Sequence, residues 1–140
     1  MLRAAAAALG SRHPLVVGGR SAGARSAARC AADLGAQVIG VNCCTPGEAT
    51  AFFDAVQDLK PIQDGQVQLS AMPNGGDFQR IGHRYLTGVN PEYMGRFARE
   101  MAQKGMHLIG GCCGTTPQHI AAIAAAVQGL APRVPPPPAG

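Results

Sequence analysis

The sequence predicts an α/β fold built on parallel strands, because strand-like segments alternate with segments that carry helix signals. The apolar segments 36–41, 67–72 and 106–109 are short and rich in Val, Ile, Leu and Met, as in strands buried on both faces. After each segment, Thr-Pro or Asn-Pro opens a helical stretch. Three such units in succession favour a parallel sheet covered by helices.

Helix starts and stops are the clearest local signals. Thr45 precedes Pro46, and Glu48 completes a capping box, which together predict a helix over residues 48–59. Caps, prolines and terminal glycines predict the other helices: residues 21–34 ended by Gly35, residues 92–104 between Asn90-Pro91 and Gly105, and residues 118–128 between Thr116-Pro117 and Gly129.

Length and composition limit the architecture. With 140 residues, 46% of them hydrophobic and only 4% aromatic, the chain has room for one globular domain. A complete eight-stranded α/β barrel takes about 250 residues, so this chain cannot build one alone. A three-stranded parallel sheet would leave its edges unpaired. Either a partner chain supplies the missing strands, the chain oligomerises, or its folded state is marginal.

The formal charge of +4 does not indicate nucleic-acid or membrane binding. Five arginines precede the first acid, Asp33, and the remaining charges are near balance. No helical stretch combines a basic face with stacking aromatics, and no apolar run reaches the ~18 residues of a membrane span. Residues 1–17 are left unassigned, as a stub or an organellar transit peptide, and the Pro-rich residues 131–140 are predicted to be a tail or linker.

The five cysteines favour a reduced protein. An odd count with two adjacent pairs does not suit a secreted disulfide framework, so we expect a cytoplasmic chain. Cys30, in the middle of an Ala-rich helix, is expected to pack in the core.

The other four cysteines follow predicted strands. One pair, Cys43-Cys44, ends the first strand, and Cys112-Cys113 follows the last. Since the carboxyl ends of parallel strands meet at one edge of a sheet, thiolates from both pairs could converge on one soft metal ion, and zinc suits them best. Neighbouring strand residues face opposite sides, so only one of Cys43 and Cys44 should point at the metal. The alternative is that these cysteines are small buried hydrophobes.

The glycines around Cys112-Cys113 have two interpretations. Gly110, Gly111 and Gly114 precede a capped helix, where a phosphate could bind, but a phosphate cradle does not need adjacent cysteines. We expect the glycines to let the cysteines reach one ion. His83, His107 and His119 have no partner at metal-ligand spacing and are not candidate ligands.

A charge count indicates the chemistry of such a site. Three thiolates and Zn²⁺ carry a net charge of −1, which makes the metal less suited to forming hydroxide from water than a three-histidine site. An incoming thiol would still lose its proton on binding and remain a good nucleophile. No residue beyond the metal site is proposed as catalytic.

Four motifs in this order resemble the homocysteine S-methyltransferase family of zinc-thiolate barrels: Gly40-Val41-Asn42-Cys43, then 69–76 with its Pro-Asn, then Asn90-Pro91-Glu92-Tyr93, and Gly110-Gly111-Cys112-Cys113-Gly114-Thr115. The resemblance extends from about residue 19 to residue 128. It implies the last three to four βα units of an eight-fold barrel, with residues 18–130 forming the carboxyl-terminal part of a homocysteine-binding domain.

The resemblance also implies a ligand set and a reaction. Zinc would be held by Cys43, Cys112 and Cys113, and homocysteine would take a methyl group from a second substrate to give methionine. The family's other contacts to the amino acid come from earlier strands, so activity is expected to need a missing barrel half. The alternatives are a zinc-thiolate binding module and an inactive truncated remnant, which share the same motifs.

Overall fold

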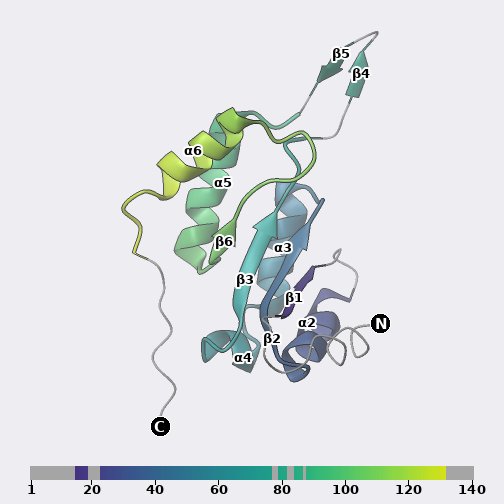
Figure 1. Cartoon of the computed structure of the whole chain (residues 1–140), viewed down its shortest axis with the longest axis vertical. Helices are drawn as coiled ribbons and strands as arrows, with labels where there is room; N and C mark the ends of the chain where they lie inside the picture. The colour runs from purple at the N-terminus through teal and green to yellow at the C-terminus, as the bar shows by residue number, and fades with distance from the viewer. Residues whose placement is uncertain (1–14, 19–22, 77–78, 82–83, 87, 132–140) are drawn as a thin grey trace.

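The computed structural model of the chain describes residues 15–18, 23–76, 79–81, 84–86 and 88–131. Strands and helices alternate through most of this part (Figure 1). In chain order the elements are β1 (Leu15–Gly18), α2 (Ala24–Asp33), β2 (Ala36–Asn42), α3 (Pro46–Val56), α4 (Lys60–Gln63), β3 (Gln68–Met72), β4 (Gln79–Ile81), β5 (Arg84–Leu86), α5 (Pro91–Lys104), β6 (Leu108–Ile109) and α6 (Pro117–Val127).

Four strands form one open, parallel sheet in the order β1-β2-β3-β6. The register between β2 and β3 runs from Val38 opposite Gln68 to Asn42 opposite Met72. Because the strand order follows the chain order and crossovers between parallel strands are right-handed, every crossover helix falls on the same face. The predicted α/β class with parallel strands is therefore confirmed.

The core lies between the sheet and this helical layer. Ile39, Val41, Leu69 and Ala71 alternate along β2 and β3 and are at most 4% exposed, because they face the helices. The opposite face is less covered: Leu108 of β6 is 44% exposed. The helices pack against one another in chain order, α2 on α3 and α6 on α5.

Several elements differ from the sequence prediction. The helix expected to reach residue 59 ends at Val56, because Pro61 cannot continue a helix and Leu59 before it is extended, so a separate short helix, α4, follows. Residues 15–17, which were left unassigned, form most of β1. The predicted strand over residues 106–109 pairs only at Leu108 and Ile109.

A loop was expected after β3, but it contains an antiparallel hairpin, β4 paired with β5, which projects away from the sheet and helices (Figure 1). The predicted start of the first helix, at residue 21, lies outside the described residues, as does His83. In the described part of the chain, no helix has the length and apolar character needed to cross a membrane.

Candidate metal centre

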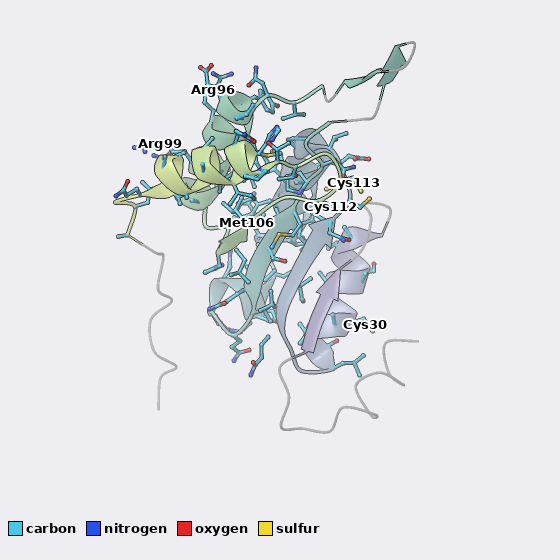
Figure 2. The ribbon with its side chains drawn as sticks, turned by 45° about the horizontal axis from the view of Figure 1, so that its top comes forward. Cys30, Arg96, Arg99, Met106, Cys112 and Cys113 are labelled. Carbon is cyan, nitrogen blue, oxygen red and sulfur yellow. The ribbon has the colours of Figure 1, made fainter. Side chains whose placement is uncertain are left out.

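Three of the five cysteines meet at the carboxyl end of the sheet. Cys43 directly follows β2, and Cys112 and Cys113 lie in the loop between β6 and α6, where Figure 2 shows the last two side by side. The Sγ atom of Cys113 is 4.0 Å from that of Cys43 and 3.9 Å from that of Cys112. All three Sγ atoms lie within 4.8 Å of one another, so one small ion could contact all of them.

The spacing of the sulfur atoms suits a tetrahedral site. With Zn–S bonds of about 2.3 Å, two sulfurs of a tetrahedron stand ~3.8 Å apart. The Sγ distances of 3.9 and 4.0 Å are close to this value. The third pair, Cys43 and Cys112, lies within 4.8 Å, so side-chain movements of at most about one ångström would complete the arrangement, and the donor set fits a soft metal ion such as zinc.

The loop after β3 lies between the two cysteine loops and bonds to both. On one side, Cys43 N donates to Met72 O (3.1 Å) and Asn74 N donates to Cys44 O (2.7 Å). On the other side, Cys112 N donates to Pro73 O (2.8 Å) and Gly75 N donates to Cys113 O (2.7 Å). Residues 72–75 therefore set the distance between ligands that are far apart in the sequence.

Close backbone contacts explain glycines in these loops. A β-carbon at Gly75 would stand 2.4 Å from the carbonyl oxygen of Gly114, and one at Gly111 would stand 2.3 Å from Oγ1 of Thr115. Neither distance is possible for a real side chain, so larger residues would push the loops apart. Gly75 and Gly111 thus have a packing role in these loops.

Cys43 has an unusual backbone. Its φ of 55° is the only positive value of a non-glycine residue in the described part of the chain. This left-handed conformation turns the chain sharply after β2, so that Cys43 joins the cluster while Cys44 packs in the core at 6% exposure. Of the two candidates that alternation left open, the structure brings Cys43 to the other thiols.

Proximity of the thiols affects their acidity. Hydrogen bonds with Cys112 and then with Cys43 raise the pKa of the Cys113 thiol, and the repulsion between neighbouring thiolates adds to this effect. A cation among the three would remove this penalty, since each thiolate would then face a positive charge.

Cys30 lies on α2, far from the other cysteines (Figure 2). The prediction that it packs in the core was wrong, because it is exposed. The buried stripe of α2 consists of Ala24, Ala28 and Ala31, and Cys30 falls beside it.

The sequence interpretation missed two features of the site. His119 is 3% exposed, and its Nδ1 accepts a hydrogen bond from Thr116 N (3.1 Å) at the start of α6. The spacing Thr-x-x-His, which puts His119 where Glu48 stands in the α3 capping box, was the available signal. In addition, Asn74 Oδ1 in the loop after β3 and Thr115 Oγ1 in the loop before α6 are buried and have no hydrogen-bond partner among the described residues.

The fold and the site define a parallel α/β chain with a thiol cluster at its strand ends, and comparison with known proteins agrees. The sequence model of the homocysteine S-methyltransferase family matches residues 10–127. The chain therefore belongs to the homocysteine S-methyltransferase family.

Two curated relatives are methionine synthases of mycobacteria. The one from Mycobacterium tuberculosis is 35% identical over 100 residues, which is 69% of this chain and 8% of the relative. The one from Mycobacterium leprae is 35% identical over 108 residues, 71% of this chain and 8% of the relative. The chain thus spans a small part of the length of these relatives.

Proposed function

We propose that this chain supplies the metal-binding part of a zinc-dependent homocysteine S-methyltransferase that forms methionine. The observation that carries the proposal is the meeting of three Sγ atoms from two strand ends, in a chain that belongs to this family. The relatives named methionine synthase support methionine as the product.

In this proposal Cys43, Cys112 and Cys113 hold zinc as thiolates. A bound zinc ion supplies a Lewis acid that lowers the pKa of an incoming thiol. Three protein ligands would leave a fourth position on the metal for that thiol, and Cys113 is exposed, so a small substrate could approach. The interlocked loops keep the thiolates in place, which makes the contribution of the chain one of orientation.

The remainder of the homocysteine pocket is proposed to come from further parallel strands. Within the described residues, β1 and β6 each pair on one side only, and the face that carries Leu108 is partly open. An eight-fold barrel, closed by strands of the same or another polypeptide, would pair these edges and enclose the face. The methyl donor would bind near the open position of the metal.

The first test measures metal binding by the purified chain. We expect about one zinc per chain by elemental analysis, and a cobalt(II) derivative with thiolate charge-transfer absorption. Replacing Cys112 or Cys113 by alanine should weaken zinc binding by more than the ~10–100-fold typical of outer-shell changes. Cys30→Ala, at an exposed position outside the cluster, is the matched control and should bind zinc as the unaltered chain does.

The second test measures methionine formation from homocysteine, with and without a polypeptide that carries the remaining strands. The methyl donors to compare are a folate, a corrinoid-carried methyl group, a betaine and S-methylmethionine. Methionine formed only when zinc and those strands are present would support the proposal. Absence of zinc from the unaltered chain, with freely reactive thiols, would contradict a site that assembles from these loops alone.

A further inference from the structure

His119 is a buried polar side chain that the proposed chemistry does not use. It lies in the first turn of α6 at 3% exposure and has a hydrogen-bond partner at each ring nitrogen. Nδ1 accepts from the backbone N–H of Thr116 (3.1 Å), with Oγ1 of the same residue at 2.8 Å. Nε2 lies 2.7 Å from the carbonyl oxygen of Val89, thirty residues earlier in the chain.

These partners define the tautomer of His119. The N–H of Thr116 points at Nδ1, so Nδ1 must offer a lone pair and carries no proton. The carbonyl oxygen of Val89 can only accept, so Nε2 carries the hydrogen and donates it. The imidazole of His119 thus accepts a hydrogen bond at Nδ1 and donates one at Nε2.

The contact with Val89 continues to the metal loop. Val89 N donates to Gly75 O (3.2 Å), and Gly75 N donates to Cys113 O (2.7 Å). The chain of hydrogen bonds therefore runs from Thr116 through His119, Val89 and Gly75 to Cys113. It closes into a ring, because Thr116 and Cys113 are three residues apart in the same loop.

We propose that His119 is a positioning residue for the metal site, which holds the Cys113 loop against the loop after β3. This inference rests on the proposed function, since it concerns the same three thiols. When this ring of hydrogen bonds is intact, the loop that carries Cys113 is held at two points, the carbonyl of Cys113 and the N–H of Thr116. The Sγ atom of Cys113 then stays near that of Cys43 at the 4.0 Å seen in the structure.

The capping box of α3 shows what the imidazole adds. There Glu48 fills the same place, and its carboxylate accepts from Thr45 N at 2.7 Å. A carboxylate cannot donate a hydrogen bond, whereas the imidazole both accepts from Thr116 and donates to Val89. Glutamate at position 119 would keep the cap and lose the donor, whereas glutamine would keep both functions.

The test compares zinc binding by His119→Gln and His119→Glu in the full chain, by competition with a chromophoric chelator. His119→Gln should bind zinc almost as tightly as the unaltered chain. His119→Glu should bind about 10–100-fold more weakly, the range for partners that orient a metal ligand. Ile123→Ala is the matched control, because Ile123 is a buried residue of the same helix with no part in the ring. It should lower the midpoint of thermal unfolding and leave zinc affinity unchanged.

Equal affinities of the Gln and Glu variants would overturn the inference, as would an Ile123→Ala variant that loses as much affinity as His119→Glu. Amide hydrogen exchange of the metal-free chain gives an independent readout. We expect Gly75 N–H and Val89 N–H to exchange faster in His119→Glu than in His119→Gln, and equal rates would again overturn it. If the unaltered chain binds no zinc, the proposed metal site fails, and exchange still decides whether His119 holds the loops together.

Discussion

At the scale of single residues, the backbone of Cys43 determines which of two adjacent cysteines reaches the thiol cluster. A φ of 55° is costly for a residue with a β-carbon and persists only where surrounding contacts hold it. Here the hydrogen bond from Cys43 N to Met72 O fixes the turn. Alternation along a strand predicts that the two side chains diverge, but which one faces the cluster depends on this turn.

Cys43→Ala and Cys44→Ala should therefore have opposite effects. We expect Cys43→Ala to abolish tight zinc binding with little effect on the stability of the metal-free chain, because its side chain is only partly buried. Cys44→Ala should keep one zinc per chain and cost about 1 kcal/mol of unfolding free energy, since it removes a buried sulfur from the core. Elemental analysis and urea unfolding measure the two effects. Zinc retained in Cys43→Ala and lost in Cys44→Ala would contradict the assignment.

The cysteines of the candidate site were largely predictable from sequence, but the residues that hold their loops in place were not. Cys43, Cys112 and Cys113 follow apolar segments, and a shared position after parallel strands predicts that they meet. The role of His119 could not be deduced, because its partner Val89 lies thirty residues away, in a loop whose course no local signal indicates. The exposure of Cys30 could not be deduced either. It depends on which face of α2 packs against the sheet, and an Ala-rich helix gives little indication of that face.

At the scale of elements, the loop after β3 acts as a spacer between the two cysteine loops. Gly75 is its tightest point, with no room for a β-carbon beside the carbonyl of Gly114. Asn-Gly is an ordinary turn signal, so the sequence alone did not separate a simple turn from this close contact.

Gly75→Ala should disturb both stability and metal binding. The added methyl group must push the Gly114 backbone away, at a cost of about 1–3 kcal/mol. The displaced loop should bind zinc about 10–100-fold more weakly, as when an outer-shell support is lost. Gly88→Ala is the control, because a β-carbon there meets nothing within 4 Å. It should change stability by no more than about 0.5 kcal/mol. Equal zinc affinity in both variants would show that the spacer has no such role.

Element boundaries followed the strength of their local signals. The starts of α3, α5 and α6 were predicted from Thr-Pro and Asn-Pro, and the end of α5 from Gly105, whose φ is 117°. The predicted end of α3, at residue 59, was wrong, because Pro61 cannot continue a helix and α3 ends earlier, at Val56. Strand β1 and the β4–β5 hairpin have three or four residues per strand, too few for a periodic pattern to stand out.

At the scale of the whole molecule, the sheet has one face covered by helices and one face that this chain leaves partly open. Leu69 and Leu108 lie on adjacent strands but on opposite faces, since Leu108 pairs with Ser70. Leu69 is fully buried under the helices, whereas Leu108 is 44% exposed. The α/β class followed from the sequence, but the extent of the open face depends on how the helices cover the paired strands, which no local signal indicates.

The two leucines should respond differently to truncation. Leu69→Ala should cost about 2–5 kcal/mol of unfolding free energy, as for other buried leucines. Leu108→Ala should change it by about 0.5 kcal/mol or less in the chain alone. Urea unfolding measures both values, and sedimentation establishes that the chain is monomeric during the measurement. A large loss for Leu108→Ala in a monomer would show that the open face is covered by another part of the chain.

The separation of the thiols along the chain has a consequence for folding. Cys43 and Cys113 are 70 residues apart, so the complete ligand set exists only after β2, β3 and β6 have assembled. A metal ion that needs all three thiolates binds the folded chain and only weakly the unfolded one, and it stabilises the fold by mass action. At a free metal concentration of 100 times the dissociation constant, the gain is about 2.7 kcal/mol. If zinc is that ion, its supply would govern how much of the chain is folded.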